Sequence, residues 1–108
     1  MGKNVVEPTK EIVNMAEIVR SKRKEEIGVD YFLNELVGKE IVILSVDVGE
    51  QVFEALVDGK KVRVAYRGAV AVKRLKAVYD VIKAANVAVK AKVIRRESRA
   101  GRTYVDLV

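Results

Sequence analysis

The stretch "KEIVILSVDVGEQVFEALVDGKKVRVAYRG", residues 39–68, decides the fold class of this 108-residue chain. Apolar and polar residues alternate along three segments of it, which is the period of a β-strand with one buried face. Gly49-Glu50 separates the first two segments, and Asp58-Gly59, a strong two-residue hairpin signal, separates the second from the third. The stretch therefore predicts a meander of three antiparallel strands.

The third of these strands has two chemically different faces. Alternation assigns Val62, Val64 and Tyr66 to the core side. The opposite side then carries three cations, Lys61, Arg63 and Arg67. One face of the predicted sheet is therefore apolar and the other is basic.

After Gly68 the apolar period changes to that of a helix, which we predict over residues 69–85 with Asn86 as its left-handed stop. Two further alternating segments follow, residues 87–94 and 102–108, joined by the loop "RRESRAG". In the last strand, alternation points Arg102, Tyr104 and Asp106 outward.

The first 37 residues have a helical pattern. A helix is predicted from Pro8, with Ile12, Met15 and Val19 on one stripe, and Gly28 ends it. A second short helix is predicted over residues 31–37, capped by Asp30. We expect the stripe to pack on the rest of the chain, and the alternative is a homodimer or a protein partner that covers Ile12, Met15 and Val19.

From residue 38 onward the order is strand, strand, strand, helix, strand, strand. Residues 38–108 in this order resemble an OB-fold domain, a five-stranded Greek-key barrel. The predicted fold class is thus mainly β with helices: a helical extension, residues 1–37, and an OB-like barrel, residues 38–108, with a helix between strands three and four. The resemblance implies a nucleic-acid ligand lying across strands two and three, flanked by the loops after strands one and four.

The charge of the chain is concentrated in its second half. Residues 60–108 hold fourteen Lys and Arg against three Asp and Glu, a net +11, whereas residues 1–59 hold seven against twelve, a net −5. Such an excess attracts polyanions. We therefore predict a non-catalytic protein that binds single-stranded DNA, or RNA as the second choice, through Lys61, Arg63, Arg67, Lys90, Lys92, Arg95, Arg96, Arg99 and Arg102.

Single-strand binding also uses aromatic surfaces on which bases stack. Tyr104 is the first candidate, because alternation points it outward beside Arg102. Phe53 is the second, provided that the register of its strand exposes it, and Tyr66 is the third because alternation places it in the core.

Several function classes lack their residues. The chain has no cysteine and no histidine, so thiolate or imidazole chemistry is absent, and no GxxxxGK[ST] or GxGxxG loop occurs. We expect no enzyme, no cofactor and no metal site. One remote alternative is a Mg²⁺-dependent nuclease, suggested by Asp47, Glu50, Glu54 and Asp58-Gly59-Lys60. The other alternative is an assembly module that uses the N-terminal helix.

The chain also lacks a run of apolar residues typical of a signal peptide or a membrane span. We expect a cytoplasmic protein with no membrane partner. Few amides, one proline and abundant Val, Lys, Arg and Glu are typical of a thermophile, so we expect a thermophilic archaeon or an archaeal virus as the source.

Overall fold

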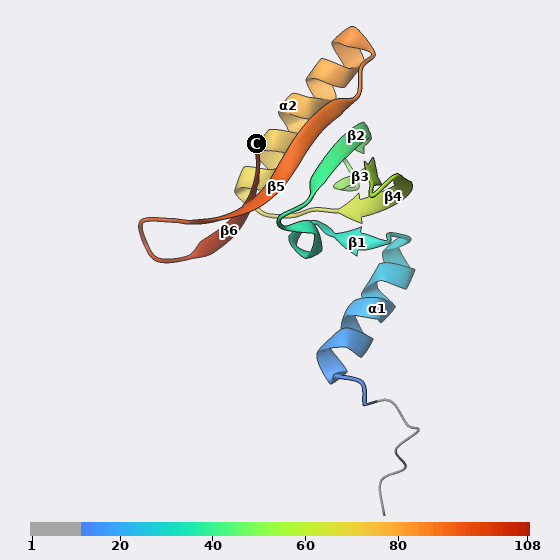
Figure 1. Ribbon diagram of the computed structural model, residues 1–108, viewed down its shortest axis with the longest axis vertical. Helices are drawn as coiled ribbons and strands as arrows, with labels where there is room; N and C mark the ends of the chain where they lie inside the picture. Colours follow the sequence, from blue (N-terminus) through green and yellow to red (C-terminus); the bar gives the residue numbers. More distant parts are fainter. Residues whose placement is uncertain (1–11) are drawn as a thin grey trace, which may run out of the picture.

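The computed structural model describes residues 12–108. In chain order its elements are α1 (Met15–Ile27), β1 (Tyr31–Phe32), a 3₁₀ turn (Leu33–Leu36), β2 (Glu40–Asp47), β3 (Val52–Val57), β4 (Lys60–Ala65), α2 (Ala69–Ala85), β5 (Val89–Glu97) and β6 (Thr103–Leu107). The six strands form one sheet in the order β1-β4-β3-β2-β5-β6. This sheet is curled into a half-barrel, with α2 beside it (Figure 1).

The predicted meander is confirmed. β2 pairs antiparallel with β3, and β3 pairs antiparallel with β4. Asp58 and Gly59 both have positive φ, 52° and 79°, as a tight hairpin turn of the mirror-image type requires. The pairing of β2 with β3 shifts register between Ile43 and Ser45, and a bulge of this kind bends and twists a strand. The bulge therefore contributes to the curl of the sheet.

The helix predicted over residues 69–85 is confirmed as α2, which connects β4 to β5. It ends at Asn86, whose φ of 52° is left-handed. Ala71 and Leu75 are its buried residues, and they join a core that the sheet supplies. After α2 the chain returns to the far edge of β2, where β5 pairs antiparallel with it, and β6 pairs antiparallel with β5.

The core is mostly aliphatic and lies inside the curl of the sheet. Its largest fully buried side chains, each less than 2% exposed, include Phe53, Leu36, Ile41, Ile43, Leu75, Val64 and Val93. Residues from β2, β3, β4, β5 and α2 therefore share one hydrophobic interior.

The helix predicted over residues 31–37 is confirmed only in part, as a 3₁₀ turn over Leu33–Leu36, and the count of five strands is wrong. Tyr31 and Phe32 form a sixth strand that pairs parallel with Val64 and Ala65 of β4. Asp30 is the physical reason: its N–H donates to the Arg63 carbonyl at 2.8 Å, and its carboxylate accepts from the Arg63 N–H at 2.9 Å. These two bonds hold the chain extended along β4, so Asp30 does not cap a helix.

The segment that contains β1 belongs to the compact unit. Val29, Leu33 and Leu36 are buried, and the latter two are part of the core. The expected domain boundary at residue 38 therefore falls inside the folded unit, which begins at about Val29.

The helix α1 starts later than predicted and does not pack on the sheet. It begins at Met15 after Asn14, whose side chain accepts from the Ala16 N–H at 2.8 Å, while Pro8 lies outside the described residues. No residue of α1 is buried, and Ile12, Met15 and Val19 are 89%, 71% and 52% exposed. Within residues 12–108 this stripe stays exposed, contrary to our expectation that it packs on the rest of the chain, and α1 projects from the sheet (Figure 1).

Asp106 does not point into solvent as alternation predicts. It is 2% exposed, and its two carboxylate oxygens accept from Arg74 Nε of α2 at 2.9 Å and Arg96 Nε of β5 at 2.7 Å. The Leu107 N–H is a third donor, at 2.7 Å. Alternation fails here because α2 packs against β6, so this end of the strand is covered on both faces. Asp106 joins α2, β5 and β6.

None of the helices within residues 12–108 is long and apolar enough to cross a membrane.

We expect Asp106→Asn to lower the free energy of unfolding by about 1.5–3 kcal/mol at pH 7, because two charge-assisted hydrogen bonds are weakened. The hydrogen bond from Arg74 is the largest factor that lowers the Asp106 pKa from 3.8 to about 2. A carboxyl whose pKa is lower in the folded state stabilises the fold above its unfolded pKa, and this stability is lost as pH falls through the folded value.

The difference between wild type and Asp106→Asn in urea unfolding should therefore shrink between about pH 4 and pH 2. Asp80→Asn is the matched control, since Asp80 pairs with Lys76 on the exposed surface and should change stability by less than about 1 kcal/mol. Equal effects of the two substitutions at pH 7 would contradict the role of Asp106.

Candidate functional site

A groove of about 1520 Å³ runs along the side of the molecule where the sheet does not close. Residues of α1, the β1 segment, the end of β4, the start of α2 and the start of β6 line it. Among the described strands, β1 occupies the outer edge of β4, and β6 pairs with β5 alone. Because β4 and β6 do not pair with each other, the groove remains between them. Its size exceeds the roughly 300–1,000 Å³ of small-molecule sites, which favours an extended ligand.

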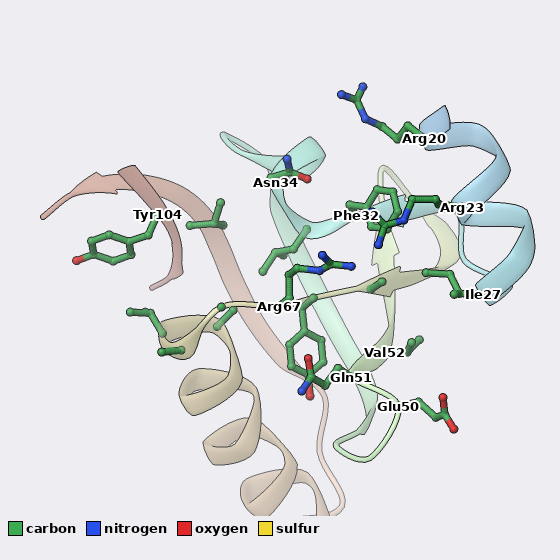
Figure 2. A pocket seen from close by; sticks show the side chains of 18 of the residues that line it. Arg20, Arg23, Ile27, Phe32, Asn34, Glu50, Gln51, Val52, Arg67 and Tyr104 are labelled. Carbon is green, nitrogen blue, oxygen red and sulfur yellow. The ribbon is translucent and has the colours of Figure 1, made fainter. Parts of the chain in front are cut away.

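Arginine is the dominant charged residue of this groove. Five arginines from four segments line it, Arg20, Arg23, Arg63, Arg67 and Arg102, against two acidic residues, Glu26 and Glu50. Figure 2 shows Arg67 extending into the space between Tyr104 on one side and Arg23 on the other. The groove is therefore strongly electropositive.

Four of these arginines are free of ion pairs within residues 12–108, although the charge of Arg20 contributes to the lowered pKa of Glu35. The side chains of Arg20, Arg23, Arg67 and Arg102 make no ion pair with any residue there, and all four are exposed. No hydrogen bond to another described residue uses the side-chain N–H donors of these four arginines, and a guanidinium has five such donors in the planar arrangement that matches phosphate oxygens.

Arg63 differs from the other four because it also has a structural role. Its Nε donates to the Gly28 carbonyl at 3.1 Å, and its NH1 lies 3.9 Å from Glu54. It therefore fixes the end of α1 to β4, while about half of its side chain remains exposed. Arg63 forms part of the groove wall but is less free to reach a ligand.

Apolar residues form much of the rest of the lining, which also includes Asn34, Gln51, Ser98 and Thr103. The apolar residues include Phe32, Leu33, Ala65, Tyr66 and Val105, with Tyr104 half-buried on the β6 side. The first turn of α2 also opens here, and Gly68, its N-cap residue, has no side chain to bond the free N–H groups of that turn. The groove thus combines flat or apolar surface with cations at its sides.

Of the eleven residues that the sequence predicts for binding, the structure brings four together in the groove: Arg63, Arg67, Arg102 and Tyr104. Arg96 is bonded to Asp106, as described above. Lys61 lies 3.7 Å from Glu54, and Lys90 lies 3.4 Å from Glu40. Lys92, Arg95 and Arg99 are exposed outside the groove lining, with Arg95 and Arg99 on the β5–β6 hairpin that extends from the body.

Phe53 is not available for base stacking. It is 1% exposed, and its ring lies 6.0 Å from that of Tyr66 in the core. The register of β3 places it opposite the buried Val64, so this strand turns its Phe53 side inward. Tyr66 is buried as predicted, and burial raises the pKa of its hydroxyl, followed in size by the nearby charge of Asp47.

Sequence reasoning missed Arg20 and Arg23. They belong to the run "RSKRK", residues 20–24, which the sequence places in the last turn of a helix, where cations suit the dipole. In the structure only Lys24 of this run lies in the last turn of α1. The signal that could have singled out Arg20 and Arg23 is that four cations lie together in a half of the chain whose net charge is −5.

Lys24, the last cation of this run, anchors α1. Its Nζ lies 2.8 Å from a Glu35 carboxylate oxygen and about 6 Å from the ring centres of Tyr31 and Phe32. Burial raises the pKa of Glu35, but hydrogen bonds from Lys24 and the Phe32 N–H outweigh burial, so the pKa is lowered overall. The polar contacts between α1 and the sheet, within residues 12–108, come from this last turn and from Gly28.

The carboxylates that suggested a nuclease have other contacts. Asp47 accepts from the Gly49 and Glu50 N–H groups of its turn, Asp58 pairs with Lys39 at 2.7 Å, and Glu54 lies beside Lys61. Across residues 12–108 no group of three or more acidic side chains is placed to hold a metal ion. These carboxylates therefore give the nuclease alternative no support.

The chain matches no protein-family model, no curated protein and no solved structure. Its function is therefore argued from the groove itself.

We expect Lys24→Gln to detach α1 from the sheet, because it removes the ion pair and both contacts with aromatic rings. A 13-residue helix without tertiary contacts is marginal in water, so amide hydrogen exchange within Met15–Ile27 should accelerate.

Unfolding of the sheet should change by less than about 1 kcal/mol. Lys22→Gln, which removes the same charge from the same helix, should leave exchange unchanged. Identical exchange in wild type and Lys24→Gln would show that Lys24 does not anchor the helix.

Proposed function

We propose that this protein binds single-stranded nucleic acid in the arginine groove, with DNA the first expectation and RNA the second, and that it does so without catalysis. The observation that carries the proposal is the convergence of Arg20, Arg23, Arg67 and Arg102, from three separate segments and without ion pairs in residues 12–108, on one groove beside Tyr104. Cations gathered in one groove are compensated best by a polyanion.

The lining favours a single strand over an isolated anion. A single strand presents phosphates and flat base surfaces at alternating positions, and proteins bind it with a cationic groove and aromatic platforms. The groove offers both, since its arginines flank an apolar lining that includes Tyr104 and Phe32. The free N–H groups at the start of α2 add a favourable dipole for a phosphate next to Arg67.

The strand order supports the OB-like interpretation of the fold. β2, β3 and β4 are joined by hairpins, and β5 returns through α2 to pair with β2. The resulting spatial order, β5-β2-β3-β4, is that of a Greek key, as in an OB-fold. In this chain the barrel is open between β4 and β6, and the groove lies along that opening.

The alternative is an assembly module that uses α1. The exposed side chains of Met15, Ile18 and Val19 favour it. The groove-facing side of the same helix carries Arg20 and Arg23, however, and two arginines without an ion pair in the described part of the chain suit an anionic ligand better than an apolar protein surface.

Binding should be mostly electrostatic and therefore steeply dependent on salt. We expect fluorescence anisotropy to show tight binding of labelled single-stranded DNA or RNA at low salt and weaker binding of a duplex. The logarithm of the association constant should fall linearly with the logarithm of the salt concentration. Absence of binding to any of the three at low salt would refute the proposal.

Two substitutions in the groove test the cationic mechanism. The double variant Arg67→Gln/Arg102→Gln should make the slope of log K against log salt concentration shallower by about 1.4. This is about 0.7 for each phosphate that the variant no longer neutralises. Lys60→Gln/Lys83→Gln removes the same charge from exposed positions outside the groove lining and should leave the slope nearly unchanged. Equal slopes for the two double variants would indicate diffuse attraction rather than contacts in the groove.

Tyr104 tests the stacking component. Tyr104→Leu should weaken binding by about 1–3 kcal/mol, the contribution of one base stacked on an aromatic ring, whereas Tyr104→Phe should retain wild-type affinity. Anisotropy at fixed salt measures both, and circular dichroism confirms that the variants are folded. Equal affinities for the leucine and phenylalanine variants would remove stacking from the mechanism.

A further inference from the structure

The face of α1 that borders the groove is unusual in its composition. Val19 and Ile27 lie on it together with Arg20 and Arg23, and all four side chains line the groove. Val19 is 52% exposed and Ile27 is 48% exposed, so no part of residues 12–108 buries them. Although α1 contributes no residue to the core, it places two apolar and two cationic side chains along one side of the groove.

Another face of α1 points away from the groove. Ile18 and Lys22 also lie on the helix, 44% exposed in the case of Ile18, but neither borders the groove. Positions one residue apart on a helix point about 100° away from each other. The helix therefore contains two matched pairs of neighbours. Val19 and Arg23 line the groove, whereas Ile18 and Lys22, of the same chemical types, lie outside it.

We propose that α1 is a wall of the binding site whose packing partner is the bound strand itself. This inference rests on the proposed function and extends the binding site to α1, which lies outside both the basic residues 60–108 and the OB-like residues 38–108. Arg20 and Arg23 bind phosphates on the α1 side of the groove, in addition to those bound by Arg67 and Arg102, and Val19 and Ile27 cover the apolar surfaces of bases.

Charge complementarity identifies the occupant. An apolar protein surface would bury the two arginines without partners, which is costly. A second copy of α1 would bring the same arginines together. A single strand supplies phosphate to each arginine and apolar base surface to each aliphatic side chain, so it satisfies both components of the face.

The way in which α1 is attached leaves its groove-facing side open for a bound strand to pack on. Lys24 holds the last turn to Glu35, Tyr31 and Phe32, and Gly28, with a left-handed φ of 70°, connects the helix to β1. Val19, Arg20, Arg23 and Ile27 thus belong to a helix that is held at its C-terminal end and extends away from the sheet (Figure 1). A ligand that contacts them gains a surface that the fold itself leaves uncovered.

Matched pairs of variants test this wall. Arg20→Gln/Arg23→Gln should reduce the steepness of the salt dependence by about 1.4 for single-stranded DNA or RNA, whichever binds, and Lys22→Gln should leave it within about 0.3 of wild type. Val19→Ser should weaken binding about fourfold, the effect of roughly one buried CH₂ group, while Ile18→Ser should not. All variants lie on exposed positions, so folding is expected to be preserved.

Hydrogen exchange with and without the strand is the second readout. Amides within Met15–Ile27 should be protected when the labelled strand is bound, because the helix then packs on it. Light scattering in the absence of nucleic acid should give one monomer mass for wild type, Val19→Ser and Ile18→Ser.

The outcomes separate the two proposals. If wild type binds but Arg20→Gln/Arg23→Gln behaves like Lys22→Gln and α1 gains no protection, the function stands and the wall is refuted. If wild type is a dimer that Val19→Ser dissociates, α1 is an assembly surface and the wall is again refuted. If wild type binds no strand at low salt, both the function and the wall are refuted.

Discussion

Two hydrogen bonds between Asp30 and the backbone of Arg63 determine that this sheet stays open. They hold Tyr31 and Phe32 against the outer edge of β4, which would otherwise be a free edge able to pair with another strand. With that edge occupied, β6 pairs with β5 alone within the described chain, and the barrel does not close between β4 and β6. The opening along which the groove lies follows from this local constraint.

The other side of the opening depends on Asp106. A single buried carboxylate receives Arg74 from α2, Arg96 from β5 and the N–H of Leu107, so it fixes β6 relative to the helix and the neighbouring strand. Its three donors satisfy it, and no buried side-chain N or O atom in residues 12–108 lacks a partner. Arg102 and Tyr104 lie two to four residues before Asp106, so the same clamp places them on the groove wall.

The parts of the fold that the sequence predicts correctly are those set by local chemistry. Asp58-Gly59 specifies a turn through its own backbone preferences, and Asn86 and Gly28 stop helices in the same way. The errors come from polar residues whose partners are distant in sequence. Aspartate is a common helix cap, but Asp30 instead bonds the backbone of Arg63, which is 33 residues away in the sequence. Alternation places Asp106 on the surface, but Asp106 is bonded to Arg74, which is 32 residues away. Periodicity also could not reveal that β3 turns Phe53 inward or that Arg96 belongs to a structural pair.

The distribution of arginines gives the strongest physical argument for a ligand. In residues 12–108, Lys39, Lys61, Lys76 and Lys90 each lie within 4 Å of a carboxylate, and Arg74 and Arg96 share Asp106. Arg20, Arg23, Arg67 and Arg102 make no such ion pair in this range, and they line one groove together with apolar side chains. Under the proposed function, an anion with charges repeated along its length contacts more of these arginines at once than a single phosphate does.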